Sequence, residues 1–118
     1  MYTVYGIPNC DTVKKALTWL EAHQIPYSFH NYKKQGITAA KLKNWSSQTG
    51  WEALVNRKGT TLRKLDPEVQ ASITSEKAAI QLLAAHTSAI KRPLIENADG
   101  NVTALGFDPV VYEKAFKK

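Results

Sequence analysis

Cysteine is nearly missing from this 118-residue chain, which contains a single thiol, Cys10. One cysteine cannot form an internal disulfide, and it cannot build a cysteine-cluster metal site. The three histidines show no HExxH or similar metal-binding spacing. We therefore expect no bound metal and no tightly bound cofactor. Any redox cycle at Cys10 has to borrow its second thiol from another molecule.

Long hydrophobic runs and blocks of one charge are missing as well. No apolar stretch approaches the roughly 18 to 20 residues that a membrane span needs. The N-terminus has no basic segment followed by an apolar one, so we expect no secretory signal and a cytoplasmic location. The formal net charge is +6, but the basic residues are scattered, which argues against a nucleic-acid-binding arm.

The first part of the chain predicts a strand–helix–strand unit. Residues 2–5 are aromatic and β-branched, and residues 25–32 form a second such run. Between them, apolar residues from Val13 to Leu20 repeat at helical spacing. Two strands joined by one helix favour parallel pairing with a right-handed crossover.

The middle of the chain is predicted to be helical. Residues 38–49, the segment "WEALVNR" and residues 74–86 carry helical patterns. The last of these helices is expected to bury Ala78, Leu82 and Leu83. No linker, repeat or low-complexity segment divides the chain, and 43% of its residues are hydrophobic. We therefore expect a single domain, residues 1–118, and a monomer.

The last part predicts a β-hairpin followed by a helix. Two extended runs, residues 89–97 and 102–107, are joined by an Asp-Gly turn. Asp108 and Pro109 then start a helix, as a cap followed by proline at the first helical position. This order predicts an α/β fold with a mixed sheet, in which a helical insertion at about residues 36–88 separates a βαβ half from a ββα half.

Cys10 lies at the first turn of the predicted helix in "YGIPNCDTVKKALTWL". A free thiol has a pKa of about 8.5, so only about 3% of it is thiolate at pH 7. Unpaired N–H groups and the helix dipole stabilise an anion there, and Lys14 and Lys15 add positive charge. The alternative is a buried structural cysteine. The Pro-Asn break before Cys10 and the polar residues after it favour an exposed nucleophile.

A second signal is "IKRPL", in which Arg92 precedes Pro93. An X-Pro bond is the only kind that readily becomes cis, and the alternative is an ordinary trans proline entering an edge strand. Next to a strand–helix–strand start with cysteine at the helix N-terminus, the pattern favours cis. A thioredoxin-like sheet carries a cis-proline beside its active cysteine, in the loop before the third strand.

These stretches together resemble the arsenate reductase (ArsC)/Spx family, a group with the thioredoxin fold, and in particular its ArsC-like (YffB-type) branch from Gram-negative bacteria. The matching segments are "TVYGIPNCDTVKKALTWL", "WEALVNRKGTTLRKL" and "AIKRPLI". They span almost the entire chain in the order of the family. The resemblance implies a thioredoxin-like mixed sheet with the helical insertion described above.

The resemblance also implies roles for individual residues. In the reductases of this family the N-terminal cysteine attacks arsenate, glutathione then joins to it, and glutaredoxin releases the product, so Cys10 is the implied nucleophile. Of three arginines that bind the oxyanion, the second matches Arg92 and the first matches Arg57. The third has no match, because Gly106 and Phe107 stand at its place.

Two departures argue against arsenate as the substrate. The third arginine is missing, and Val13 replaces a serine that supports the thiolate in these reductases. A highly charged tetrahedral anion needs several charge-assisted hydrogen bonds, each contributing about 1.5 to 3 kcal/mol. Two arginines are adequate for the carboxylates of glutathione. Further anion-binding candidates are Arg63, Lys14, Asn9 and Thr12.

The sequence therefore predicts a glutathione-dependent thiol reductase, with glutathione as co-substrate and glutaredoxin as a further partner. A true arsenate reductase is one alternative. Another is a regulator similar to Spx that binds RNA polymerase, although Val13 breaks the C-x-x-C pair through which such proteins sense oxidation. A cysteine–histidine hydrolase has the least support, because His23 is expected to interact with the dipole at the end of the first helix.

Overall fold

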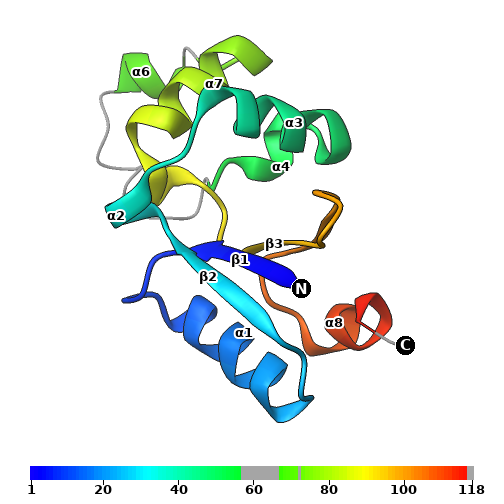
Figure 1. Ribbon diagram of the computed structural model, residues 1–118. Helices are drawn as coiled ribbons and strands as arrows, with labels where there is room; N and C mark the ends of the chain where they lie inside the picture. The colour runs from blue at the N-terminus through cyan, green and yellow to red at the C-terminus, as the bar shows by residue number, and fades with distance from the viewer. Residues whose placement is uncertain (57–66, 72, 117–118) are drawn as a thin grey trace. The chain divides into compact units, whose positions relative to one another are not determined.

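The computed structural model describes residues 1–56, 67–71 and 73–116 (Figure 1). The chain divides into two compact units. The first comprises Met1–Gln35 and Arg92–Lys118, and the second comprises Gly36–Lys91. The second unit covers the segment in which a helical insertion was expected. In the described part of the chain, no helix is long and apolar enough to cross a membrane.

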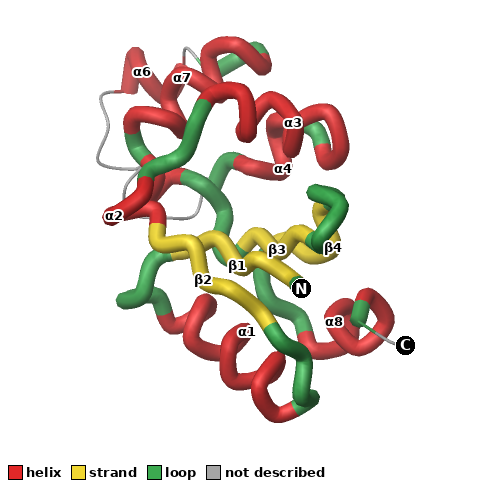
Figure 2. The backbone as a smooth tube through the Cα atoms, viewed as in Figure 1, coloured by secondary structure: helices red, strands yellow, loops and turns green. Residues whose placement is uncertain are grey.

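The first unit contains a mixed sheet, whose strands lie side by side in Figure 2. The strands are β1 (Tyr2–Gly6), β2 (Tyr27–Asn31), β3 (Leu94–Glu96) and β4 (Val102–Leu105). Among the described residues their order is β2-β1-β3-β4. β1 pairs with β2 in parallel and with β3 antiparallel, and β3 pairs antiparallel with β4. The predicted thioredoxin-like arrangement, with a parallel βαβ half and an antiparallel ββα half, is confirmed.

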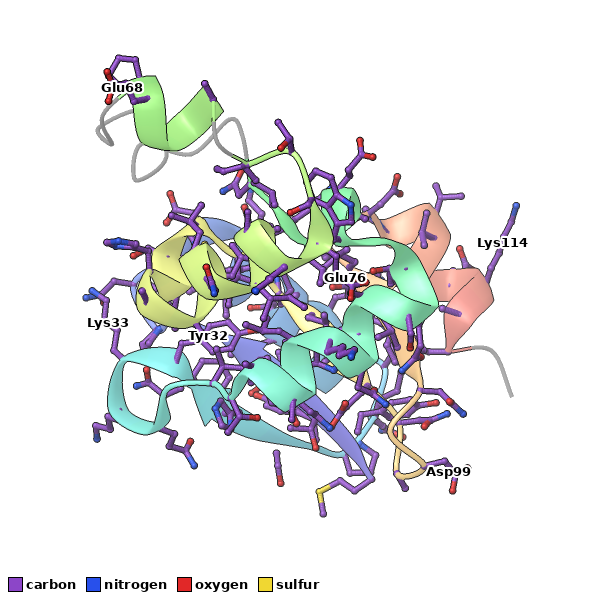
Figure 3. The ribbon with its side chains drawn as sticks, turned by 90° about the horizontal axis from the view of Figure 1, so that it is seen from above. Tyr32, Lys33, Glu68, Glu76, Asp99 and Lys114 are labelled. Atoms are coloured by element: carbon purple, nitrogen blue, oxygen red, sulfur yellow. The ribbon has the colours of Figure 1, made fainter. Side chains whose placement is uncertain are left out.

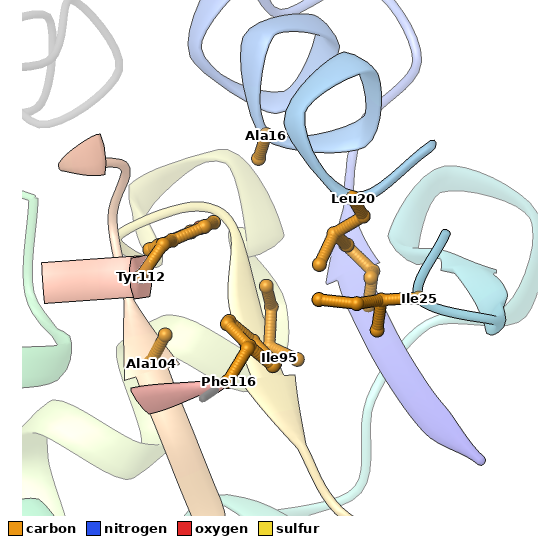
Figure 4. Packing of buried hydrophobic residues seen from close by; sticks show 8 residues of the cluster. Ala16, Leu20, Ile25, Ile95, Ala104, Tyr112 and Phe116 are labelled. Atoms are coloured by element: carbon orange, nitrogen blue, oxygen red, sulfur yellow. The ribbon is translucent and has the colours of Figure 1, made fainter. Parts of the chain in front are cut away.

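Two helices cover one face of this sheet. They are α1 (Asp11–Ala22) and α8 (Pro109–Ala115). Alternate strand residues point to this face and pack with both helices in one apolar cluster (Figure 4). The cluster consists of Val4, Ala16, Leu20, Ile25, Ile95, Ala104, Tyr112 and Phe116. Burying one large aliphatic or aromatic side chain contributes about 1.5 to 3 kcal/mol, so this cluster fixes α1 and α8 on the sheet.

The hairpin between β3 and β4 turns at the predicted Asp-Gly pair, with Asp99 at its tip in Figure 3. The side-chain oxygen of Asn97 accepts the N–H groups of Asp99 and Asn101, both at 3.0 Å. Gly100 has φ +82°, a left-handed conformation that glycine adopts without strain. The local sequence therefore determines this turn.

The extended run predicted at residues 89–97 is shorter in the structure. A 3-10 helix, η1 (Thr87–Ala89), precedes it, and only β3 belongs to the sheet. The Lys91 N–H donates to the Leu54 carbonyl, and Ile90 forms an isolated bridge with Val55, directly after α4 (Trp51–Leu54). These backbone groups are used within the second unit, which explains why residues 89–91 do not join the sheet.

The second unit is mainly helical, as predicted. Its other described helices are α3 (Ala39–Thr49), α6 (Pro67–Ala71) and α7 (Glu76–Ala85), while the short α2 (Tyr32–Gln35) belongs to the first unit. Thr38 and Ser75 cap α3 and α7 with their hydroxyl oxygens. The prediction that α7 buries Ala78 is wrong, because Ala78 lies in the capped first turn at the edge of the buried face. Ala79 and Ile80 are buried instead.

Candidate active site

Cys10 is the N-cap residue of α1. Its backbone is extended, with φ −119° and ψ 121°, and its carbonyl accepts the Lys14 N–H at 2.9 Å. The side chain is partly exposed, whereas Pro8 and Asn9 before it are exposed. Cys10 is therefore neither sealed in the core nor fully in solvent, which is the setting of a reactive thiol.

A close contact between β1 and α1 places the loop that carries Cys10. Gly6 ends β1, and a Cβ atom built there would approach a methyl carbon of Val13 to 2.9 Å. Any side chain at position 6 would push the first turn of α1 away from the strand. Val13 itself is fully buried. The Gly6–Val13 contact therefore fixes the start of the helix, while residues 8 and 9 remain outside the core.

The surroundings of the Cys10 sulfur favour its ionised form. Burial raises the pKa of the thiol, but other interactions outweigh this effect and hold the pKa below its ordinary value. They are the hydrogen bond from the Val13 N–H, the hydrogen bond and positive charge of Arg92, and the hydrogen bond from the Thr12 N–H. Each favours the thiolate, because an N–H donor or a cation stabilises an anion more than a neutral thiol.

The sequence assigned part of this effect to Lys14 and Lys15. Both lie on exposed positions of α1. Among the described residues, Arg92 supplies the positive charge that lowers the pKa of Cys10. The assignment to the two lysines is therefore corrected. Neither lysine is among the groups whose interactions lower this pKa.

Arg92 reaches Cys10 from the loop that leads into β3. The peptide bond between Arg92 and Pro93 is cis, the isomer expected from the sequence. Pro93 is buried, and its carbonyl accepts the Gly106 N–H at 2.8 Å, which continues the β3–β4 pairing by one residue. The sheet therefore positions the loop from which the guanidinium extends to the thiol.

Gly106 and Phe107 occupy the place at which the resemblance implies a third arginine. Gly106 has φ +83° and is buried. Phe107 packs edge-on against the Tyr112 ring, with 5.1 Å between ring centroids. Its side chain is thus an apolar neighbour of the core rather than a cation. The site therefore offers an anionic substrate less positive charge than a site with three arginines would.

The other residues predicted to bind an anion are only partly covered by the structure. Arg57 and Arg63 lie outside the described residues. Asn9 and Thr12 are exposed beside Cys10, and Thr12 contributes its backbone N–H. Lys14 lines a hollow of about 410 Å³ along α1. The other lining residues are Lys15, Thr18, Trp19, Ala22 and Phe107.

A buried polar group in the first unit escaped the sequence analysis. The Tyr5 hydroxyl of β1 donates to a carboxylate oxygen of Glu96 in β3 at 2.6 Å, and both residues are buried. Burial raises the pKa of Tyr5, and the bond to Glu96 adds to this effect. Tyr32 is also buried, and the electrostatic field of Arg92 acts on its hydroxyl. The sequence did contain one signal of this bond: Glu96 stands in a short, otherwise apolar strand, where a buried carboxylate needs a hydrogen-bond donor.

His23, the histidine weighed as a partner for the thiol, lies at the other end of α1. It is the C-cap residue of the helix, and its Nδ1 lies 2.8 Å from the Trp19 carbonyl oxygen. The twelve residues of α1 lie between it and Cys10, a separation of about 20 Å along the axis at a rise of 1.5 Å per residue. A hydrolase that pairs Cys10 with His23 is therefore ruled out by distance.

Comparison with known proteins agrees with this geometry. A model of the ArsC family matches residues 5–115. This chain belongs to the ArsC family. A Haemophilus influenzae protein is 44% identical to it over 116 residues, which cover 98% of this chain and 99% of that protein. The global transcriptional regulator Spx of Streptococcus pneumoniae is 29% identical over 100 residues, covering 83% of this chain and 74% of that protein.

Solved structures of ArsC relatives have the same fold. A structure described as the YFFB protein is 44% identical, with a TM-score of 0.89 and coverage of 98% of each chain. The solution structure of an arsenate reductase (ArsC) related protein from Brucella melitensis is 46% identical, with a TM-score of 0.77. It covers 99% of this chain and 95% of its own. The family and fold inferred from the sequence are thereby confirmed.

Proposed function

We propose that this protein is a glutathione-dependent thiol reductase with Cys10 as its single nucleophile. The observation that carries the proposal is the partly exposed Cys10 sulfur, to which the Arg92 side chain and the N–H groups of Thr12 and Val13 are hydrogen-bonded. A lowered thiol pKa provides the thiolate, which is the form that attacks disulfides. Membership of a family that includes arsenate reductase-related proteins supports a reductase.

The reaction proceeds through one mixed disulfide. The Cys10 thiolate attacks the glutathionyl sulfur of a disulfide between a substrate thiol and glutathione, and the substrate departs as its thiolate. A second glutathione thiolate then attacks the glutathionyl sulfur on Cys10, giving oxidised glutathione and restoring the Cys10 thiolate. Overall, one free glutathione is consumed: the substrate sulfur is reduced to its thiolate, and the glutathionyl group that it carried leaves joined to the free glutathione as oxidised glutathione. This scheme suits a chain with no second cysteine.

Arg92 has two roles in this proposal. In the free protein its charge stabilises the thiolate. When glutathione is bound, the guanidinium also offers charge-assisted hydrogen bonds to one of its carboxylates. One guanidinium is enough to bind one carboxylate, whereas arsenate needs several charged hydrogen-bond donors around its tetrahedral oxygens. Phe107, which occupies the place of the third arginine, supplies none.

Mass spectrometry after incubation with oxidised glutathione near neutral pH tests the proposal. We expect the mass of the protein to increase by one glutathionyl group, located on Cys10, and the Cys10→Ser protein to remain unmodified. Reduced glutathione should then remove the group. An unmodified wild-type protein would contradict the proposal. Turnover of a small glutathione mixed disulfide by wild-type protein, and not by Cys10→Ser, extends the test from reactivity to catalysis.

Two other functions have specific support from the comparisons. The match to the global transcriptional regulator Spx favours a regulator, for which the resemblance implies binding to RNA polymerase. Stable capture of the C-terminal domain of the polymerase α subunit, unaffected by Cys10→Ser, would favour that function over the reductase. The arsenate reductase-related structure favours arsenate as substrate. Addition of arsenate and glutathione to the same protein, with arsenite as the measured product, distinguishes this alternative.

A further inference from the structure

Two hydrogen bonds connect the loop that carries Arg92 to Tyr112, a residue that has no role in the proposed reaction. Gly106 follows β4 directly, and its N–H donates to the Pro93 carbonyl at 2.8 Å. On its other side, the Gly106 carbonyl accepts the Tyr112 hydroxyl of α8 at 2.5 Å. The Gly106 peptide region is thus bonded in one direction to the loop that carries Arg92 and in the other to the core.

Tyr112 is itself held firmly. Only 1% of its surface is exposed. Its ring makes edge contacts with Trp19, Phe107 and Phe116, at centroid distances of 5.4, 5.1 and 5.4 Å. Burial raises the pKa of its hydroxyl, so the group remains a neutral donor throughout the physiological pH range. A fixed ring and a permanently protonated hydroxyl make a dependable anchor for a backbone carbonyl.

Gly106 needs such an anchor. Its φ of +83° lies in the left-handed region, which glycine enters freely because it has no Cβ atom. The same freedom lets an unrestrained glycine peptide rotate. Hydrogen bonds on both sides select one orientation, and that orientation directs the N–H to Pro93. The residue before Pro93 is Arg92, whose side chain is bonded to Cys10.

We propose that Tyr112 is a positioning residue for the Cys10 site: its hydroxyl fixes Gly106, Gly106 fixes Pro93, and the Arg92 guanidinium is thereby kept on the Cys10 sulfur. The inference rests on the proposed function, because it concerns support of the same nucleophile. Tyr112 acts through the backbone and takes no part in the chemistry. Its removal therefore changes the ionisation of the thiol as well as the stability of the fold.

The test replaces Tyr112 with phenylalanine, which deletes one oxygen and retains the ring. Thiolate absorbance is followed against pH in the full-length protein. We expect the Cys10 midpoint in Tyr112→Phe to rise by about half a unit or more, a roughly three-fold lower ratio of thiolate to thiol at pH values below both midpoints. The matched control is Tyr27→Phe, which removes a hydroxyl bonded to Glu21 at 2.9 Å. Tyr27→Phe should not change the midpoint of Cys10 ionisation.

Each result decides between a positioning role and a structural one. A Tyr112→Phe protein with a lower melting temperature and an unchanged Cys10 midpoint would overturn the inference. In an Arg92→Gln background the added Tyr112→Phe change should move the midpoint no further, and a full additional shift would also overturn it. If Tyr112→Phe does not fold, Gly106→Ala disturbs the same peptide, and an unchanged midpoint there is equally decisive.

The same titration separates this inference from the proposed function. A wild-type midpoint below the ordinary thiol value, unaffected by Tyr112→Phe, contradicts only the role of Tyr112. A wild-type midpoint at or above the ordinary value contradicts both. A lowered midpoint that rises in Tyr112→Phe supports the positioning role, even where no glutathione adduct forms and the reductase proposal fails.

Discussion

The two helices that cover the sheet, α1 and α8, begin with different chemistry. At α8 the Asp108 carboxylate accepts the N–H groups of Val110 and Val111, at 2.9 and 3.4 Å. At α1 the N-cap residue is Cys10, whose side chain carries a sulfur atom in place of an oxygen acceptor. The cap of α8 is an oxygen acceptor that serves the fold directly.

The N–H groups at the start of α1 serve a different purpose. Those of Thr12 and Val13 hydrogen-bond to the Cys10 sulfur and favour its thiolate. Donors that stabilise the fold at α8 therefore stabilise a reactive ion at α1. The start of α1 thus has no oxygen cap, and its N–H groups, together with Arg92, favour ionisation of the thiol.

Arg92→Gln should produce the largest change, because it removes the positive charge that distinguishes the start of α1. The pKa of Cys10 is expected to rise by about one unit, which lowers its rate of alkylation by iodoacetamide at pH 6.5 roughly ten-fold. Arg92→Lys, which retains the charge, should have a smaller effect. Lys14→Gln should have almost none, and a larger effect of Lys14→Gln than of Arg92→Gln would refute the assignment of the charge.

Asp108→Ala tests the other side of the comparison. Loss of a carboxylate cap should lower the free energy of unfolding by about 1 kcal/mol. Cys10→Ala should lower it by less than half as much in acidic solution, where the thiol is protonated and its sulfur is a much weaker acceptor than a carboxylate oxygen. Urea denaturation of both variants at pH 5 measures the two values. Equal losses would show that the two helix starts do not differ in the way described.

The pH dependence of stability provides a subtler test at Cys10. Its pKa is lower in the folded protein than the ordinary value, so the unfolded chain binds the proton more tightly. The stabilisation is complete above the ordinary thiol pKa and is lost as pH falls through the lowered value. The difference in unfolding free energy between wild type and Cys10→Ala should therefore increase from pH 5 to 9.5. A constant or shrinking difference would be inconsistent with the lowered pKa.

Tyr32→Phe should have the smallest effect on stability. It also tests whether Arg92 acts on the Cys10 thiol directly, without help from the Tyr32 hydroxyl. Among the described residues, the buried Tyr32 hydroxyl has no hydrogen-bond partner. Its removal should change the free energy of unfolding by less than about 0.5 kcal/mol, or raise that energy. Tyr5→Phe, which breaks the bond to Glu96, should cost about 1 to 3 kcal/mol. A marked change in Cys10 alkylation in Tyr32→Phe would show that the neighbouring hydroxyl matters.

Local patterns predicted much of the fold. The start of α1 after the Gly-Ile-Pro-Asn break, the Asp-Gly hairpin and the Asp108 cap all depend on residues adjacent in sequence. The shorter extended run before β3 was missed, because backbone groups near residue 90 bond to residues near 55. Such long-range pairing leaves no periodic signal in the sequence.

The candidate site could be predicted only in part for the same reason. Cys10 was predicted to be the nucleophile from its position at the start of a helix. Arg92 is 82 positions away, and its expected role came from the family resemblance, since spacing alone cannot bring it to the thiol. The Tyr5–Glu96 bond and the bond from Tyr112 to Gly106 are tertiary contacts. The local sequence shows at most that a glutamate in an apolar strand needs a partner, and it does not show which residue provides one.

The electrostatic support of Cys10 has a consequence for the lifetime of any disulfide that it forms. A sulfur that is stable as an anion is also a good leaving group when another thiol attacks its disulfide. The arginine and N–H donors that prepare the sulfur to react therefore also make its adduct easy to break. Under the proposed function, the modified protein should therefore persist only while free thiols are scarce.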